Sequence, residues 1–488
     1  MKKLVCLFLI VAVVLTMSLS SALAQEKVSL EIWSNASGMP ADDANVILPA
    51  IEEATGLDLE WNVFSNDYDV SLNVRLGSGD FPDIFQIPYN MIGACLKQDV
   101  LLDVSTIWDQ LGDVAAVYSD SDYAHMFYSG EMCVIPVRQN LPYLSFNIRK
   151  DWLDNLGMEI PKTLDDLYDV LYAFTYNDPD GNGKNDTYGI SGAGLDGFAA
   201  ILMAYGVANP EDFIIRDGKL SYSAIDDNMK EAIVFIKKMV DAGIVDPEMM
   251  TNSSSEHRDK AIRGEVGMVW IDLWNMHKQV YTDQIKEINP DAEWILLDGV
   301  EGPAGKYAHI NPTASATRYY ALSANLEDEP EKLAAAIQLL NYLSNPTTGG
   351  RLVSFGIEGV HYELGENDSI NALPAMNDLT YSWVYQITGR EDYSYLCAKF
   401  GYAREFIDYI ASDSINLLNT YNGAVSAPES VNVADIERYA EEEITRFIYG
   451  ERSLEEWDSY VETLRNVYGL DAYMEKAESD LKTAGYLE

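Results

Sequence analysis

Residues 27–64, KVSLEIWSNASGMPADDANVILPAIEEATGLDLEWNVF, contain the pattern that decides the fold. Apolar and polar residues alternate over 28–33 and again over 57–64, and this alternation is typical of half-buried strands. The residues between these strands predict a helix over 44–55, which ends at Gly56 because helices commonly stop at a glycine.

The same order continues along the chain. Residues 73–76 belong to a second predicted helix, which the segment GSGDFP at 77–82 stops. Residues 84–87 form a third short strand, closed by Pro88. Because strands that alternate with helices form parallel sheets, we predict an α/β fold with a doubly wound sheet.

Helical signals dominate the second half of the chain. Thr163 precedes apolar residues at spacings of three and four, and Asp166 completes an acidic variant of the capping box. Further helices are predicted over 228–242 and 331–343 and from Ser453 onward. The sequence contains no internal repeat, low-complexity tract or long linker, which favours two lobes that exchange chain segments.

The first residues, MKKLVCLFLIVAVVLTMSLSSALA, place two lysines before an apolar run and end in an A-x-A cleavage site. This pattern predicts a signal peptide over residues 1–24. A membrane anchor is the alternative, but the apolar run is shorter than the ~20 residues that a span needs. Cys6 lies inside the apolar run rather than at the cleavage point, so no lipid anchor is predicted. We expect a soluble exported protein, either periplasmic or extracellular.

The chain has 33 basic and 78 acidic side chains, a formal net charge of −45. Such a field repels phosphate backbones and anionic membranes, so nucleic acid and membrane lipid are not predicted partners. Polyanionic ligands are disfavoured as well, unless a local basic pocket overrides the mean charge. Cys95, Cys133 and Cys397 remain after the predicted cleavage and permit one disulfide at most, so stability must come from an apolar core.

An acidic loop, NDPDGNGKNDTYG, occupies residues 177–189. The calcium-loop pattern D-x-[DN]-x-[DN]-G is matched by Asp178 (position 1), Asp180 (3), Asn182 (5), Gly183 (6), Lys184 (7) and Asp186 (9). Calcium takes about six to eight oxygens, which alternate side chains of a tight coil and one carbonyl can supply in part.

This match is incomplete, because position 12, which carries a bidentate Glu in a helix–loop–helix site, is Gly189. The alternative is a polar turn, rich in D-P, D-G and N-G, that holds no metal. We predict a calcium ion with a structural role, since a cation with a full oxygen shell stabilises a loop and activates no water.

Several stretches, taken in order along the chain, resemble one protein family. Besides the acidic loop they are GSGDFPDIFQI (77–87), YLSFNIRKDWLDNLGMEIPKTLDDLYDVLYAF (143–174), AIRGEVGMVWIDLW (261–274), FGIEGVHYEL (355–364) and GERSLEEWDSYVETLRNVYGLDAYMEKAESDL (450–481). Together they resemble the extracellular solute-binding proteins of ABC importers, in the carbohydrate-type family that includes lipoprotein and alginate-binding members. The resemblance covers nearly the whole chain after the predicted signal peptide.

The resemblance implies a two-lobed, type II periplasmic-binding-protein-like α/β fold, with a doubly wound sheet and helices in each lobe and a helical C-terminal region. We expect residues 25–145 plus 324–360 in the first lobe and 146–323 plus 361–488 in the second. It also implies a monomer without enzyme activity that traps a carbohydrate, an oligosaccharide, between the lobes. The permease subunits of an ABC transporter would receive the sugar.

Members of this family often carry a calcium loop with the pattern D-P-D/N-G-N-G-K-x-D. The residues that match it here are Asp178, Asp180, Asn182, Lys184 (through its carbonyl) and Asp186. Many relatives have Glu after the final Asp, where this chain has Thr187. Many also carry a lipid-anchoring cysteine, and its absence here favours a free periplasmic or secreted protein.

A sugar presents apolar C–H faces and a rim of hydroxyls, so aromatic rings and carboxylates are expected to line the cleft. Trp270, Asp272 and Trp274 alternate at a spacing of two and would share one face of a strand. Trp33 is a second candidate, because open α/β sheets bind ligands beyond the carboxyl ends of their strands. For each tryptophan the alternative is packing in the core.

Three further sites are candidates for the cleft. Trp383 and Tyr385 form an aromatic pair that either lines the cleft or belongs to the core. Asp83 either caps a helix or reaches the cleft. Asp196 lies in the turn 192–197, whose glycines spell G-x-G-x-x-G. Export and negative charge argue against a dinucleotide there, so we interpret it as a tight strand-to-helix connection.

Two other functions compete with solute binding. An exported glycoside hydrolase needs two suitably separated carboxylates, and 78 acidic residues provide such pairs easily. The sequence contains neither H-E-x-x-H nor G-x-S-x-G, which leaves this alternative without a motif. The other alternative is the peptide-binding subunit of an importer.

Overall fold

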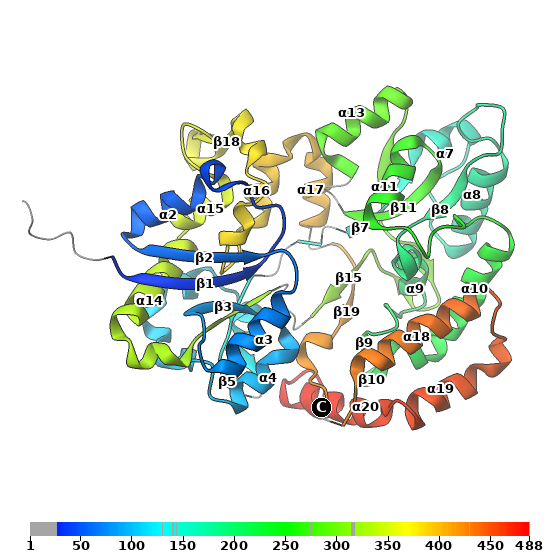
Figure 1. The fold of residues 1–488 in the computed structure, drawn as a ribbon. Helices are drawn as coiled ribbons and strands as arrows, with labels where there is room; N and C mark the ends of the chain where they lie inside the picture. Colours follow the sequence, from blue (N-terminus) through cyan, green and yellow to red (C-terminus); the bar gives the residue numbers. More distant parts are fainter. Residues whose placement is uncertain are drawn as a thin grey trace, which may run out of the picture.

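The computed structural model describes residues 27–487 except 129, 139–140, 143, 273–275, 314–317, 413 and 429 (Figure 1). The predicted signal peptide lies outside the described residues. Two α/β lobes lie side by side, each built on its own sheet, as the sequence predicts. Within the described residues, no helix has the length and apolar character to cross a bilayer.

The first lobe is built on a five-stranded sheet of order β2-β1-β3-β16-β6. Its strands are β1 (Ser29–Asn35), β2 (Asp58–Phe64), β3 (Ile84–Ile87), β6 (Ile135–Pro136) and β16 (Tyr319–Leu322). β1 pairs in parallel with β2 and with β3, as the β-α-β-α-β order predicts. β16 comes from far along the chain and pairs antiparallel with β3 and β6, so the sheet is mixed rather than wholly parallel.

Helices cover both faces of this sheet. One face packs under α2 (Ile47–Thr55), α5 (Gly112–Val117), α14 (Pro330–Ser344) and α15 (Gly349–Phe355), and the other under α3 (Tyr68–Ser78) and α4 (Tyr89–Lys97). In β1, Leu30 and Ile32 pack toward the first set and Trp33 toward the second, which explains the alternation in the sequence. The chain leaves α2 at Gly56, whose φ of 72° is the left-handed helix stop expected there.

The second lobe is built on a four-stranded sheet of order β12-β7-β11-β8. Its strands are β7 (Leu144–Arg149), β8 (Tyr188–Ser191), β11 (Val266–Asp272) and β12 (Trp294–Leu297). β8 is parallel to β11, and β7 is antiparallel to both β11 and β12. The helices of this lobe are α7 (Lys150–Leu156), α8 (Leu164–Tyr176), α9 (Ala199–Ala204), α11 (Ser254–Arg263) and α13 (Gln279–Ile288).

The start of α8 confirms the predicted capping box. Thr163 Oγ1 accepts a hydrogen bond from the backbone N–H of Asp166 at 3.1 Å, and Asp166 Oδ2 accepts one from the N–H of Thr163 at 3.0 Å. Two backbone donors at the helix start are thereby satisfied, which fixes where α8 begins.

A helical layer extends the core of the second lobe, at the lower right of Figure 1. It consists of α10 (Asp227–Asp241), α18 (Val433–Ile448), α19 (Trp457–Asn466) and α20 (Leu470–Thr483), with the hairpin β9 (Phe213–Arg216) and β10 (Lys219–Tyr222). The predicted helical C-terminal region is thus confirmed, and its last helix reaches the boundary between the lobes.

Long-range segments join the lobes. The chain crosses from β6 to β7 and returns from β15 (His309–Pro312), which pairs with β19 (Leu417–Thr420), to β16. The smaller elements are α6 (Asp120–Ala124), α16 (Asp392–Lys399), α17 (Arg404–Ile410), β4 (Phe127–Tyr128), β5 (Glu131–Met132), β13 (Glu301–Gly302), β14 (Gly305–Lys306), β17 (Tyr362–Leu364) and β18 (Ile370–Ala372). Leu379, Tyr381, Tyr385 and Ile387 pack in the core of the first lobe.

Candidate functional site

Two adjacent cavities lie between the lobes, with volumes of about 320 and 980 Å³. Tyr89, Tyr128 and Ser426 line both of them. The first lobe contributes α4 along its length and the β4–β5 hairpin, while the helical layer of the second lobe contributes the opposite wall. A ligand held here would therefore contact both lobes.

Three tyrosines form an aromatic surface on the first-lobe side. Tyr89 begins α4 directly after β3, at the carboxyl edge of the parallel strands, and Tyr319 opens β16 opposite Ile87. The ring centroid of Tyr89 lies 5.6 Å from that of Tyr128 and 5.6 Å from that of Tyr319. Burial, and then the neighbouring phenols, raise the pKa of Tyr89, so its hydroxyl stays protonated and can donate.

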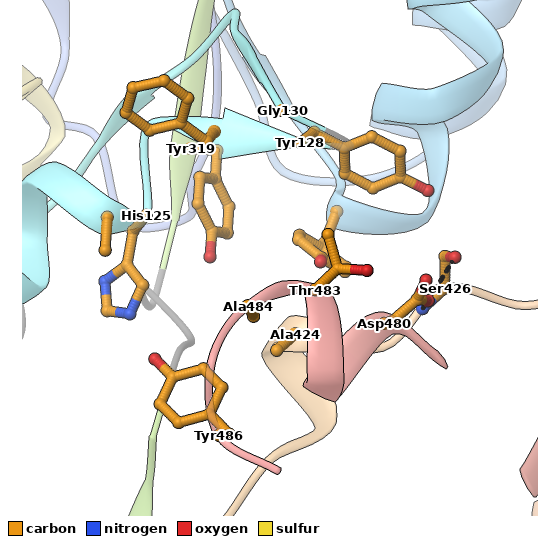
Figure 2. Close-up of a pocket in the computed structure, with 14 residues that line it drawn as sticks. His125, Tyr128, Gly130, Tyr319, Ala424, Ser426, Asp480, Thr483, Ala484 and Tyr486 are labelled. Carbon is orange, nitrogen blue, oxygen red and sulfur yellow. Dashed lines mark hydrogen bonds between the residues drawn. The ribbon is translucent and has the colours of Figure 1, made fainter. Parts of the chain in front are cut away.

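The opposite wall combines one aromatic ring with a polar cluster (Figure 2). Tyr486 packs against Tyr421 with ring centroids 5.3 Å apart. Asp480 accepts hydrogen bonds from the backbone N–H of Ser426 at 2.9 Å and from its hydroxyl at 2.7 Å. The same carboxylate forms an ion pair with Lys476 on the preceding turn of α20.

His125 lines the smaller cavity from the first lobe. Its side chain is 6% exposed, and neither ring nitrogen has a hydrogen-bond partner among the described residues. Burial lowers the pKa of this imidazole, although the nearby Asp122 partly opposes the shift. The ring is therefore neutral at neutral pH, with one donor and one acceptor nitrogen.

These cavities differ from the site that the sequence predicts. Trp33 is 6% exposed: its Nε1–H donates to Glu31 Oε1 at 2.8 Å, and its ring packs against Phe64. Trp270 is 7% exposed and packs against Phe146, with ring centroids 4.5 Å apart. Both rings belong to the cores of their lobes.

Two more predicted residues are also buried. The Tyr385 hydroxyl accepts a hydrogen bond from Asn45 Nδ2 at 2.6 Å, and its ring meets Trp61 edge-on. Asp83 accepts a hydrogen bond from the backbone N–H of Glu31 at 2.8 Å and forms an ion pair with Lys332 at 3.1 Å. These contacts tie β1, β3 and α14 together.

The remaining predicted cleft residues are dispersed. Asp272 is half-buried at the carboxyl end of β11, on the same face as Trp270, as the spacing of two predicts. Trp274 lies outside the described residues. Trp383 is half-buried under the Arg318 guanidinium, 4.8 Å from the ring centroid, and Asp196 is exposed. None of the predicted residues that the structure describes lines either cavity, and their contact with a ligand stays a prediction.

The G-x-G-x-x-G turn has a packing role, as predicted. A Cβ on Gly192 would lie 2.5 Å from the Cα of Gly197, and one on Gly197 would lie 2.0 Å from Met249 Cε. The glycines are therefore required by close backbone approach at a strand-to-helix connection.

The acidic loop coils between α8 and β8. Asp178 Oδ2 accepts a hydrogen bond from the N–H of Gly183 at 2.9 Å, and the Asn182 amide donates to Asp180 at 2.9 Å and to Asp186 at 3.1 Å. Asp178 Oδ1 is buried without a hydrogen-bond partner in the described part of the chain. Burial, with added repulsion from Asp178 and Asp186, raises the pKa of Asp180.

The loop does not form a closed metal shell here. Position 12, Gly189, lies inside β8, where a Cβ would come within 2.5 Å of the Leu171 carbonyl oxygen, so no acid can occupy it. Over the described ranges, no three His, Cys, Asp or Glu side chains are grouped so that they could hold a metal ion. The donor set of carboxylates, one amide and one carbonyl nevertheless has the chemistry that calcium prefers.

Sequence reasoning missed the tyrosine surface. Tyr89 directly follows the predicted strand 84–87, so the argument applied to Trp33 also selects it. Tyr128, Tyr319 and Tyr486 carry no local signal, because only the tertiary structure brings them to the same cavity.

The sequence profile of a family described as bacterial extracellular solute-binding protein matches residues 40–349. The matched region covers more than half of the chain. The chain belongs to this family.

Individual relatives of this solute-binding protein agree with the assignment. It is 27% identical to the fructooligosaccharide ABC transporter substrate-binding protein FusA of Streptococcus pneumoniae, over 54% of this chain and 53% of FusA, about half the length of that relative. It is 25% identical to the lipoprotein LipO of Bacillus subtilis, over 86% of both chains. It is 23% identical to the polygalacturonan/rhamnogalacturonan-binding protein YtcQ of the same species, over 87% of this chain and 85% of YtcQ.

Solved structures confirm the two-lobed type II fold. FusA in complex with kestose matches with a TM-score of 0.72 over 94% of this chain and 99% of that chain, at 21% identity. The alginate-binding protein AlgQ2, described as without calcium ion, matches with a TM-score of 0.71 over 95% and 99%, at 17% identity. FusA has also been solved as an EF-hand mutant, at 20% identity, a TM-score of 0.70 and coverage of 94% and 99%. These identities show the fold alone.

The comparisons also bear on the alternative of an exported hydrolase. The matched family is one of solute-binding proteins and FusA is named as the substrate-binding protein of an ABC transporter, so this chain is a binding protein rather than an enzyme. The sequence-based assignment to the carbohydrate-type family is confirmed.

Proposed function

We propose that this protein is the extracytoplasmic substrate-binding component of an ABC transporter and that it binds an oligosaccharide in the two interlobe cavities. The observation that carries the proposal is the aromatic lining, to which the first lobe supplies Tyr89, Tyr128 and Tyr319 and the second lobe Tyr486. The relative FusA, named for fructooligosaccharides and solved with kestose, supports a saccharide as ligand.

The side chains suit the chemistry of a sugar. Aromatic faces cover the apolar C–H face of a pyranose or furanose ring, and phenol hydroxyls reach the sugar hydroxyls at its edge. Asp480 and Ser426 supply further hydrogen-bonding groups on the opposite wall. From the sequence we also propose that Trp270, Asp272 and Trp274 contact the ligand, in addition to the residues that line the two cavities.

Binding and transport follow from the two-lobed arrangement. A ligand that contacts both lobes binds the closed form more tightly than the open form, so it shifts the population toward closure. We propose that the permease subunits recognise the closed monomer and that the sugar is released unaltered. We propose that the two moving bodies follow the predicted division into residues 25–145 plus 324–360 and 146–323 plus 361–488, with one change. β16 and the segment with Leu379, Tyr381, Tyr385 and Ile387 move with the first lobe, whose sheet and core they join.

We also propose that the acidic loop binds a structural calcium ion. Two observations support a cation at this loop. Asp178 Oδ1 is buried without a hydrogen-bond partner among the described residues, and burial, with added repulsion from Asp178 and Asp186, raises the pKa of Asp180. Asp178, Asp180, Asn182, Asp186 and the Lys184 carbonyl would hold the ion, which would supply charge neutralisation. FusA has been solved as an EF-hand mutant and AlgQ2 in a form described as without calcium ion, and both descriptions are consistent with a calcium loop in this fold.

The proposed location is outside the cytoplasmic membrane. The family is extracellular, and the pattern in residues 1–24 supports cleavage of a signal peptide to give a free periplasmic or secreted protein. N-terminal sequencing and a lipid-labelling assay of the exported product distinguish a free protein from a lipid-anchored one; the relative LipO is named a lipoprotein.

The function is tested by isothermal titration with a panel of oligosaccharides, paired with solution scattering. Binding to at least one saccharide, a smaller radius of gyration on binding, and recovery of intact sugar by chromatography are expected. A protein that binds no member of the panel, or that cleaves its ligand, overturns the proposal. Peptides of similar length serve as the comparison series, and preferential peptide binding favours the alternative importer class.

A further inference from the structure

Among the described charged side chains that line the two interlobe cavities, carboxylates outnumber lysines. The lysines are Lys97 and Lys476, and the carboxylates are Glu131, Glu437 and Asp480. Among the described residues, no arginine lines either cavity. A bidentate arginine is the side chain best suited to bind a ligand carboxylate or phosphate. The described charged side chains that line the cavities, two lysines and three carboxylates, therefore sum to a formal charge of the same sign as the net charge of −45.

Lys476 is committed to groups within the protein. Its ammonium forms an ion pair with Asp480 and donates a hydrogen bond to Ser426 Oγ at 2.6 Å. The other oxygen of Asp480 accepts from the backbone and hydroxyl of Ser426. A ligand anion would have to compete with this carboxylate for Lys476. Lys97 is exposed at the end of α4, where screening by water and salt leaves an ion pair worth little.

Glu437 lines the larger cavity from the second lobe, and its side chain is half-buried. Glu437 lies on α18, has no ion-pair partner among the described residues, and has a pKa raised by burial. A second carboxylate brought beside it would lose water and meet a like charge, and both effects oppose binding. A sugar hydroxyl beside Glu437 would instead donate a hydrogen bond to it.

Among the described residues that line the smaller cavity, no side chain carries a positive charge at neutral pH. His125 is the one histidine among its lining residues, and burial keeps that imidazole neutral. Tyr89, Tyr128 and Tyr486 are half-buried and offer aromatic faces and hydroxyl groups, and Tyr319, which is 4% exposed, packs beside Tyr89. The charges and rings together fit hydroxyl groups and apolar C–H faces, and they disfavour ligand charge.

We infer that the ligand is a neutral oligosaccharide, without uronate, sulfate or phosphate on the sugar units that enter the two cavities. This inference rests on the proposed function and narrows it. The relatives are named for both neutral and acidic sugars. FusA is named for fructooligosaccharides, which are neutral, and YtcQ for polygalacturonan and rhamnogalacturonan, which contain uronic acids. The inference places this protein with the first kind of ligand.

Titration calorimetry on the full exported chain tests the inference. The panel pairs oligogalacturonides with the same oligomers after chemical reduction of their carboxylates to CH₂OH groups, and adds fructo-, xylo- and gluco-oligosaccharides. The best neutral ligand is expected to bind at least about 10-fold more tightly than any acidic one, since like-charge contacts in an interface are costly. An acidic oligomer that binds best overturns the inference but keeps the proposed function. No binding to any saccharide overturns both.

A charge-reversal pair tests where the discrimination arises. Glu437→Lys is expected to raise the affinity for oligogalacturonides at least about 5-fold, because it changes the local charge by two units. Glu287→Lys makes the same change on the exposed α13, and is expected to leave that affinity unaltered. If Glu437→Lys fails to fold, Glu131→Lys provides the change at an exposed position on the cavity wall. Equal effects of the cavity and control variants would contradict a local origin.

Discussion

The ring centroids of Tyr89 and Tyr319 lie 5.6 Å apart, with their planes inclined by 41°. Tyr89 begins α4 immediately after β3, whereas Tyr319 opens β16, a strand that reaches the first-lobe sheet from the second lobe. The aromatic wall therefore exists because a distant strand pairs antiparallel beside β3. This contact links the proposed ligand surface to one of the segments that cross between the lobes.

Replacing Tyr89 tests this surface. Tyr89→Ala is expected to weaken oligosaccharide binding by about 1–3 kcal/mol, the scale for burying a large apolar side chain, whereas Tyr89→Phe should retain most of the affinity. Titration calorimetry provides the measurement. Tyr172→Ala is the control, because Tyr172 is 44% exposed on α8 and lines neither cavity. Equal affinity in Tyr89→Ala and in the control would remove Tyr89 from the site.

Trp270 allows folding and binding to be separated. Because the ring is buried against Phe146, Trp270→Ala is expected to lower the free energy of unfolding by about 3–5 kcal/mol. Denaturant titration measures this loss. Trp270→Phe preserves more of the core packing than Trp270→Ala. If Trp270 contacts the ligand as predicted, the folded Trp270→Phe protein should still bind oligosaccharide more weakly than the wild type. Wild-type affinity in a folded Trp270→Phe protein would assign Trp270 to the core alone.

The buried histidines predict a loss of stability in acid. His309 is 1% exposed, and burial lowers its pKa to about 4. Its pKa in the unfolded chain is about 6.5, so between these values the unfolded state binds a proton that the folded state does not. The stabilising contribution is therefore present above about pH 6.5 and falls by roughly 3 kcal/mol as the pH drops through 4.

Urea unfolding between about pH 7 and pH 4 measures this dependence. His309→Phe is expected to flatten the curve, because the group that takes up the proton is absent. Burial also lowers the pKa of His277 to about 4, so part of the pH dependence of the unfolding free energy should remain in that variant. An identical slope in the wild type and in His309→Phe would show that His309 does not contribute.

Calcium is expected to raise the melting temperature, and a chelator to lower it reversibly. When free calcium exceeds the dissociation constant about 100-fold, the gain in stability is about 2.7 kcal/mol. Asp178→Asn should abolish the response, because Asp178 supplies the unpartnered oxygen of the loop. Asp458→Asn, on the exposed side of α19, removes one charge elsewhere and should keep it. A melt of the wild type that responds neither to chelator nor to calcium would contradict the site.

Several local features could be read from the sequence alone. The alternation over 28–33 and 57–64 places β1 and β2, Gly56 ends α2, and Thr163 with Asp166 caps α8. Each signal involves neighbours within a few residues, whose side chains and backbone interact whatever the rest of the chain does. The helix expected over 44–55 begins at Ile47, because a short 3-10 turn over Asp42–Ala44 precedes it.

By itself, the sequence determined the two-lobed α/β class, the acidic loop and the membership of the family. Only the tertiary structure decided that Trp33 and Tyr385 are buried, and that Tyr89, Tyr319 and Tyr486 face one cavity. The physical reason is that an aromatic residue at a strand end suits a core and a ligand surface equally well. Which of the two it meets depends on residues outside its own strand or turn, such as Phe64 for Trp33 and Asn45 for Tyr385, and no local periodicity encodes those contacts.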